Sequence, residues 1–202
     1  MSVAVISANL GKFEKRIWFK QKNIDSAKLV MYTDETFPPR FRSMNPRLQA
    51  KIPKCFGWQM EPGHDIYIWM DSAFALRKGG VEFMLGHLGD KDLAIFAHPH
   101  RNIVGDELDV IKRKEPYLLE RYENEHDGPW DLTSPIYACG IFIYRNLPKV
   151  QQMLKEWWYH QTRYHINDQL SFPTVLKESG CTFNVISEHI YNTPYFVPMR
   201  RV

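Results

Sequence analysis

The sequence has few cysteines, and its charges nearly balance. Three cysteines occur among its 202 residues, Cys55, Cys139 and Cys181. An odd count without close spacing argues against a disulfide framework or a zinc site. Because each cysteine lies among apolar residues, we expect reduced, buried thiols. The formal net charge of +3 is too small to imply nucleic-acid binding by itself.

Long apolar runs are missing as well. No run approaches the length that spans a membrane, and residues 1–6 lack the basic flank and cleavage pattern of a signal peptide. We also find no internal repeat, low-complexity tract or linker. We therefore expect one domain over residues 1–202, in a soluble protein of a reducing, cytoplasmic compartment (the host cytoplasm if a virus encodes it).

Apolar, β-branched runs alternate with amphipathic segments along the chain, which predicts strands alternating with helices. The predicted strands cover residues 3–7, 28–32, 65–71, 93–97, 136–144 and 182–186. The predicted helices cover about 45–55, 83–88, 105–125, 147–158 and 167–176. Such alternation predicts an α/β fold with a mostly parallel central sheet flanked by helices on both faces.

Two residues are expected to disturb these elements. Pro53 should kink or end the helix that Asn45 caps. Gly140 lies inside a predicted strand, where glycine often marks a bulge or a close approach by a ligand or backbone. The tail after Ser187 is expected to be irregular.

The most informative strand ends in Asp71 and Ser72. In an open α/β sheet, ligands bind outside the carboxyl ends of the strands. A carboxylate there can hold a divalent cation, and the cation can hold a diphosphate. Simple capping of the next turn by Asp71 explains this stretch equally well.

A single carboxylate rarely suffices for a cation, so a second ligand is expected. His189 follows the last predicted strand, whose end could face the same side as Asp71. Histidine beside carboxylate and phosphate oxygens would suit Mn²⁺ at least as well as Mg²⁺. The alternative for His189 is an ordinary surface histidine.

Asp168 and Gln169 open a predicted helix behind Asn167. An aspartate at a helix N-terminus could act as a general base, a nucleophile or an orienting acceptor for hydroxyl groups. The alternative is favourable pairing with the helix dipole, worth roughly 0.3–1 kcal/mol.

Other candidates follow the remaining strands or precede the Asp71 strand. His98 and Arg101 follow one strand and could contact phosphate or hydroxyl groups, while the role of His100 stays open. A basic cluster that could hold a diphosphate comprises Arg40, Arg42, Arg47, Lys51 and Lys54. Most of it is expected to be a solvated face. Arg47 and Lys51 are the preferred pair, because residues four apart share one helix face.

The order of these motifs resembles a known family. The residues that carry the resemblance are Arg47 and 51–54, the strand 67–71, His-Pro-His-Arg at 98–101, Trp157-Trp158 and Asp-Gln-Leu-Ser-Phe-Pro at 168–173. They resemble a glycosyltransferase-like family that includes plant mucilage-related and alkaline-ceramidase-named proteins. The chain is also similar to small GT-A domains of large algal viruses (chloroviruses) that build capsid glycans. The similarity spans roughly residues 32–175.

The resemblance implies a single GT-A-like domain, with a nucleotide-binding half at about 1–97 and an acceptor-binding half at about 98–202. It implies a glycosyltransferase with a UDP-sugar donor, a glycan or glycoprotein acceptor and usually Mn²⁺ or Mg²⁺. By analogy alone it favours retention of configuration. The residues that would bind the donor and its cofactor are Ala8, Asn9, Gly11, Asp34, Arg47, Lys51, Asp71, Ser72, His98, Arg101 and Gln169.

The resemblance also assigns roles to the acidic residues. Asp71 matches the last aspartate of the Asp-x-Asp metal motif, although Trp69 stands where the first would be. His189 corresponds by position to the C-terminal histidine ligand of many GT-A enzymes, so Asp71 and His189 would be the metal ligands. Asp168 corresponds to the acidic residue near the anomeric carbon, so Asp71 and Asp168 would be the catalytic pair.

Two other classes of function stay open. One is a catalytically inactive module that binds a nucleotide or a sugar, which the missing first aspartate favours. The other is a nucleic-acid-binding protein that uses the basic cluster and aromatic residues. The near-neutral net charge argues against the second.

Overall fold

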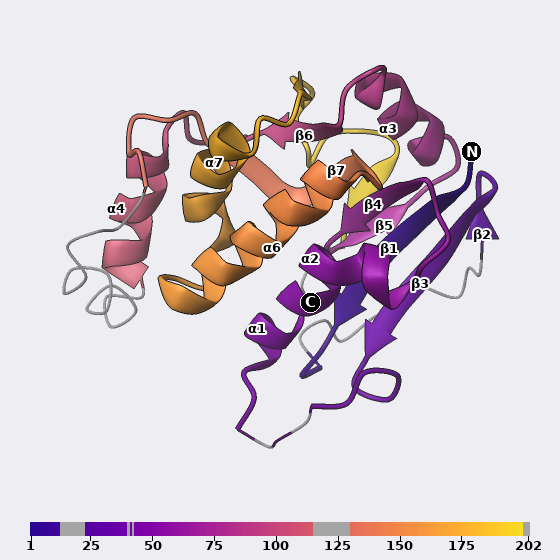
Figure 1. Cartoon of the computed structure of the whole chain (residues 1–202), viewed down its shortest axis with the longest axis horizontal. Coiled ribbons are helices and arrows are strands. Elements are labelled where there is room, and N and C mark those ends of the chain that lie inside the picture. The colour runs from indigo at the N-terminus through magenta and orange to yellow at the C-terminus, as the bar shows by residue number, and fades with distance from the viewer. Residues whose placement is uncertain (13–22, 40, 42, 115–129, 200–202) are drawn as a thin grey trace.

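The computed structural model describes residues 1–12, 23–39, 41, 43–114 and 130–199. Its centre is a seven-stranded sheet in the order β2-β3-β1-β4-β7-β6-β8 (Figure 1). The strands are β1 (Val3–Asn9), β2 (Asn23–Ile24), β3 (Ala27–Thr33), β4 (Ile66–Met70), β6 (Leu93–Ala97), β7 (Tyr137–Arg145) and β8 (Phe183–Ile186). Within this sheet β1, β3, β4, β6 and β8 run in one direction, and β2 and β7 run in the other. The predicted, mostly parallel sheet is confirmed.

Helices and a small second sheet cover the two faces of the central sheet. On one face lie α2 (Lys51–Met60), α6 (Pro148–Arg163) and α7 (Asp168–Ser179), which follow one another across the sheet in Figure 1. On the other face lie α3 (Gly80–Leu88) and the antiparallel pair of β5 (Phe74–Leu76) and β9 (Phe196–Pro198). The helix α4 (Val104–Lys114) packs against α7 at one end of the molecule.

The period-two geometry of the strands divides the core between these layers. Ile6 and Trp69 point into the core under α2, α6 and α7, whereas the adjacent Val5 and Ile68 point to the other face. All four side chains are buried. Because both faces of the sheet's centre are covered, the strands β1, β4 and β6 are continuous apolar runs rather than alternating ones.

The strand β7 carries the irregularity predicted at Gly140. Ile95 pairs with Phe142, but the next residue of β6, Phe96, pairs with Ala138, so β7 bulges between these pairs. The Gly140 carbonyl accepts a hydrogen bond from the Asp71 backbone N–H at 2.8 Å. A Cβ at position 140 would lie 3.3 Å from Asp71 Oδ2. Both a bulge and a close backbone approach are therefore confirmed.

The helix expected from Asn45 onward is interrupted on both sides of Pro53, at Ala50 and again at Phe56, whose φ of −120° and ψ of 18° are not helical, so the expected kink or end is confirmed. The helix breaks at Ala50, between α1 (Pro46–Gln49) and α2, and Pro53 lies in the first turn of α2. In the first turn a proline costs little, because its missing N–H would have no partner within the helix. Arg47 therefore lies in α1 and Lys51 at the start of α2, and the expectation that they share one helix face stays a prediction.

Further expectations concern the tail, the helix at 105–125, the basic cluster and the cysteines. The tail after Ser187 is not wholly irregular, because β9 pairs with β5 and buries Phe196. The helix expected at 105–125 is confirmed as α4 up to Lys114, and its remainder lies outside the described residues. Arg40 and Arg42 also lie outside them. The three cysteines are free and buried, as expected. None of the helices in the described ranges has the length and apolar character needed to cross a membrane.

Candidate active site

The carboxyl ends of the parallel strands bring the predicted residues to one edge of the sheet. Asn9 ends β1, and Asp34 follows β3. Asp71, His98 and His189 follow β4, β6 and β8 in the same way. Since these five strands share one direction, all these positions face the same edge, where open α/β sheets bind ligands.

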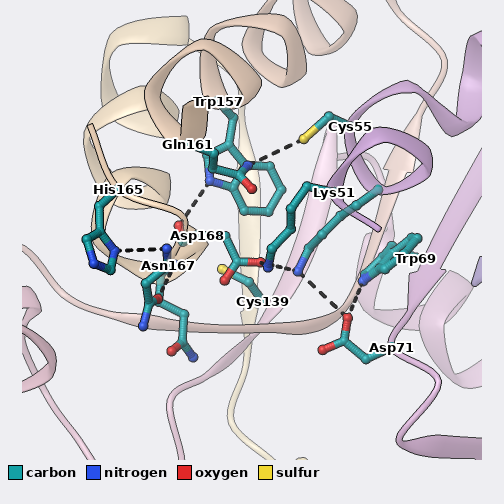
Figure 2. Close-up of polar contacts among 12 residues, drawn as sticks. Lys51, Cys55, Trp69, Asp71, Cys139, Trp157, Gln161, His165, Asn167 and Asp168 are labelled. Carbon is teal, nitrogen blue, oxygen red and sulfur yellow. Dashed lines mark hydrogen bonds and ion pairs between the residues drawn. The ribbon is translucent and has the colours of Figure 1, made fainter. Parts of the chain in front are cut away.

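Asp168 lies at the centre of this edge, at the first position of α7. Its carboxylate is buried, and its Oδ2 accepts hydrogen bonds from Lys51 Nζ at 2.5 Å and from Lys54 Nζ. Both lysines belong to the first two turns of α2. Asn167 caps α7 by accepting the Gln169 backbone N–H at 3.1 Å. Two buried ion pairs that share Asp168 therefore join the starts of α2 and α7 (Figure 2).

Lys54 is enclosed by aromatic rings as well as by carboxylates. Its side chain is 2% exposed, and its ammonium lies 5.6 Å from the Trp69 ring centroid and 5.4 Å from that of Trp157. A cation over an indole face is stabilised by the ring quadrupole. The Trp157 Nε1–H also donates to the Asp168 backbone carbonyl at 3.0 Å. The Trp pair of the sequence motif thus supplies one wall of the site, through Trp157.

Asp71 approaches the same lysine from β4. Its Oδ1 accepts the Trp69 indole N–H at 2.8 Å and lies 3.8 Å from Lys54 Nζ. Its side chain is 45% exposed, in contrast to the 11% of Asp168. Figure 2 shows Asp168 and Asp71 on opposite sides of the lysine nitrogens. Asp71 is therefore the carboxylate of this cluster that faces solvent, with Oδ2 beside Gly140.

Asp168 and the two lysines stabilise one another in the ionised state. Burial disfavours the charged form of Asp168, but the positive charges of Lys51 and Lys54 outweigh it and hold the pKa of Asp168 well below its usual range. Burial likewise disfavours charge on Lys54, but Asp168 and then Asp71 raise its pKa above the ordinary value. A carboxylate with so low a pKa is a weak proton acceptor near pH 7. The general-base role is therefore the least favoured of the three considered for Asp168.

A polar chain connects α7 to His98 and Arg101. Asn167 Nδ2 donates to Glu107 Oε1 at 3.0 Å, and Glu107 Oε2 pairs with Arg101 Nη1 at 2.5 Å. Arg101 Nη1 also lies 3.2 Å from His98 Nε2. Burial, then the charges of Arg101 and His100, lower the pKa of His98 to about 4, so this ring is neutral near pH 7. Through these contacts the buried Glu107 of α4 links His98 and Arg101 to Asn167 at the start of α7.

The ends of β1 and β3 form a second part of the edge. The Gly11 backbone N–H donates to both carboxylate oxygens of Asp34, at 3.0 and 3.1 Å. Gly11 has φ +65°, and a Cβ there would lie 2.6 Å from Pro46. The ends of β1 and β3 therefore pack against the start of α1 so closely that position 11 has no room for a side chain. Asn9 and Ala8 are buried behind this contact.

The remaining predicted residues lie in different surroundings. Ser72 is buried after β4, and Arg47 is exposed on α1. Gln169 Nε2 donates to the Tyr137 carbonyl at 3.4 Å, at the start of β7. His189 has ring contacts with His100 and Tyr191. The roles predicted for these residues in ligand or metal binding stay predictions.

The fit of a divalent cation can be judged from the donor atoms. Within the described ranges no group of three or more His, Cys, Asp or Glu side chains could hold a metal ion. Mg²⁺, however, is commonly bound by one or two carboxylates together with substrate phosphates. The exposed Asp71 fits that mode, in which most ligands would come from a diphosphate and water.

Comparison with known proteins bears on the fold. No family model matches the chain, and no curated protein sequence matches it. Among solved structures, the chain is similar to a glycosyltransferase involved in the glycosylation of the major capsid of PBCV-1. That similarity has a TM-score of 0.56 and 12% sequence identity, and it covers 98% of this chain and 93% of the other. The fold is GT-A-like.

Two further solved structures are more distant. Mouse xyloside xylosyltransferase 1 in its apo form has a TM-score of 0.42 and 16% identity, covering 80% of this chain and 63% of the other. A197 from STIV has a TM-score of 0.41 and 8% identity, covering 93% and 82%. At these scores neither adds to the argument, and the resemblance to the plant family stays a prediction.

Lys54 and Glu107 were not singled out from the sequence. Lys54 was one of five basic residues expected mostly on a solvated face, yet its neighbours Pro53 and Cys55 are buried too. Its position three residues after Lys51 was a usable signal, because residues three apart share a helix face. Glu107 carries no comparable signal, since its partners Arg101 and Asn167 lie on separate segments.

Proposed function

We propose that this protein is a glycosyltransferase that moves a sugar from a UDP-sugar to a hydroxyl group of a glycan or glycoprotein acceptor. The observation that carries the proposal is the buried cluster of Lys51, Lys54 and Asp168, with Asp71 beside it, at the carboxyl edge of a GT-A-like sheet. Charges this deeply buried are costly unless paired, and strongly perturbed ionisable groups gather at functional sites.

Different residues at the carboxyl edge of the sheet would bind the nucleotide and the diphosphate of the donor. The tight turn of Gly11 and Asp34 would hold the nucleotide, in the half of the chain before residue 98. Asp71, exposed and directed toward solvent, would then meet the diphosphate. A cation that arrives with the diphosphate, Mn²⁺ or Mg²⁺, would take Asp71 as its protein ligand and supply positive charge to the leaving group.

Asp168 would act on the sugar rather than on a proton. Glycosyl transfer develops positive charge at the anomeric carbon, and a carboxylate held ionised can stabilise that charge. The lysines keep Asp168 ionised and fix its position through α2. Retention of configuration stays a prediction, which NMR of the anomeric proton of the product would check.

One observation favours a second candidate, an inactive module that binds a nucleotide or a sugar. Trp69 occupies the place of a first metal aspartate, and its indole N–H is bonded to Asp71. Incubation with UDP-sugars and analysis of free sugar separates the candidates. Slow release of free sugar, above the rate of protein-free buffer, indicates an enzyme, and binding without release indicates the module.

The role of Asp71 is tested by calorimetry with UDP, with and without Mn²⁺. We expect Asp71→Ala to lose at least tenfold in UDP affinity in the presence of Mn²⁺, because the cation loses its protein ligand. Asp90→Ala is the matched control, because Asp90 precedes β6 at the opposite edge and is 84% exposed. Equal, metal-independent affinity in wild type and Asp71→Ala would contradict the role given to Asp71.

A further inference from the structure

A group of aromatic side chains beside Asp71 has no part in the function proposed so far. It consists of Phe74, His100, His189 and Tyr191, which we call the ring cluster. These residues come from β5, from the loop after β6 and from the segment after β8. Phe74 is buried, whereas His100, His189 and Tyr191 are exposed, Tyr191 by 49%. Exposed groups of aromatic side chains often mark binding sites.

The rings of the cluster have a common orientation. Phe74 and Tyr191 have centroids 5.6 Å apart and planes that meet at 15°. Tyr191 and His100 have centroids 6.3 Å apart and planes that meet at 16°. His189 lies across these rings, with its centroid 5.7 Å from that of His100 and 5.8 Å from that of Tyr191. The cluster therefore combines three near-parallel stacked rings, partly exposed to solvent, with a histidine ring at their side.

The cluster is directly connected to the proposed reaction centre. A Cβ built on Gly140 would lie 3.3 Å from Asp71 Oδ2 and 3.4 Å from Phe74 Cε2. The innermost ring of the cluster and the exposed carboxylate thus flank the same backbone position of β7. A ligand resting on the cluster would have its inner end near Asp71.

The backbone holds the cluster in place without help from a ligand. Ile190, between His189 and Tyr191, is 1% exposed and belongs to the core beneath α3. The Asn192 N–H donates to the His189 carbonyl at 2.8 Å, which closes a turn. Farther along, β9 pairs with β5, the strand that carries Phe74. Rings fixed before binding lose little conformational entropy on binding.

The polar atoms of the cluster indicate the kind of ligand. His189 Nδ1 accepts the Tyr191 backbone N–H at 3.3 Å. In the neutral ring the proton then lies on Nε2, which becomes a hydrogen-bond donor. A ligand that suits this surface has an apolar face for the rings and hydroxyl groups at its edge. A pyranose ring has both.

We propose that the ring cluster is the acceptor subsite and that it binds the pyranose whose hydroxyl receives the transferred sugar. This inference rests on the proposed function, because it names the acceptor side of the same site. It gives His189 a role toward the acceptor. It also assigns His100, whose role the sequence left open, to the same subsite.

The test measures saccharide binding and UDP binding separately. Wild type, Tyr191→Ala and Tyr159→Ala are applied to an array of immobilised mono- and oligosaccharides in the presence of UDP and Mn²⁺. Tyr159 is the matched control, because it is also 49% exposed but lies on α6. We expect roughly a tenfold loss of saccharide binding in Tyr191→Ala, the upper range for one aromatic contact, and none in Tyr159→Ala. UDP affinity should stay unchanged in both.

His100→Ala provides a second variant in case Tyr191→Ala does not fold, and the same loss is expected. Three outcomes would overturn the proposal. The wild type binds no saccharide on the array, the ring variants bind saccharides as wild type does, or the ring variants lose UDP and saccharides equally. If wild type fails to bind UDP but Tyr191→Ala still loses saccharide binding, the donor assignment fails and the saccharide site stands.

Discussion

At Lys54, an ammonium group with almost no access to water lies between two carboxylates and two indole rings. Burying a charge costs several kcal/mol, which only close partners can offset. Asp168 provides the closest of these contacts, and the indole rings contribute through their quadrupoles. The stability of the whole site therefore depends on the charge of Asp168.

The first residue-scale prediction concerns this charge. Asp168→Asn keeps the size of the side chain but leaves Lys54 without its nearest negative partner. Breaking a buried ion pair from one side costs about 3–5 kcal/mol, so we expect a loss of that size in the free energy of unfolding, measured by urea denaturation. Asp90→Asn, at an exposed surface pair, should change it by less than about 0.5 kcal/mol. Equal stability of the two variants would show that Lys54 has other sufficient partners.

Sequence reasoning placed Asp71 correctly at a strand end, because it follows an apolar run, and Asp168 correctly at a helix start, because it follows the capping residue Asn167. It could not show that both meet at Lys54. A lysine in a basic segment gives no sign of burial, and its burial here depends on Trp157, which is 103 positions away along the chain. Contacts between distant segments follow from topology, which a local pattern does not contain.

At the scale of elements, the turn after β1 gives a second prediction. Gly11→Ala introduces a Cβ at φ +65° that would meet two Pro46 atoms at 2.6 Å. Gly180→Ala is the matched control, because Gly180 has φ +63° and nothing within 4 Å of the added Cβ. A left-handed backbone alone costs an alanine roughly 1–2 kcal/mol. We expect Gly11→Ala to cost about 1–3 kcal/mol more than the control, from overpacking.

The measurement for this pair combines urea denaturation with UDP calorimetry. Displacement of α1 from the β1 turn should weaken UDP binding by Gly11→Ala, while Gly180→Ala, at the far end of α7, should bind UDP as wild type does. Identical stability and affinity in the two variants would mean that the turn adapts and takes no part in binding the nucleotide.

The elements themselves were predicted well where they are long. The strands β1, β4, β6 and β7 follow from apolar runs, and the caps Asn45 and Asn167 are confirmed. The direction of β7 could not be predicted, because a strand buried on both faces reads the same in a parallel and an antiparallel sheet. The pairing of β5 with β9 was missed because strands of three residues are too short for a periodic signal.

At the scale of the whole molecule, stability should depend on pH in two stages. His98 and His160 have folded-state pKa values lowered by burial, that of His98 to about 4. Between pH 6.5 and about 4 the unfolded chain therefore binds protons that the folded chain does not, and stability falls as the pH falls. Asp168 and Asp92 also have lowered folded-state pKa values. Their contributions are present above the unfolded pKa near 3.9 and are lost as acid protonates them.

We expect the urea midpoint to be constant near pH 7, to fall gently down to pH 4 and to fall steeply below it. His98→Gln should flatten the first stage, because glutamine does not titrate. Asp168→Asn should have a lower urea midpoint at pH 7, and its midpoint should fall less steeply below pH 4. A wild-type midpoint that stays constant from pH 7 to pH 3 would refute both assignments.

The pairing of β5 with β9 has a consequence for how such a protein could diversify. Residues 187–195 connect β8 to β9, and both strands are paired, so the segment is fixed at both ends. We therefore expect the exposed positions of this segment to tolerate substitution while its flanking strands and the carboxylates proposed to be catalytic stay unchanged. Exchanging this segment between homologous chains would test whether it sets the proposed acceptor preference.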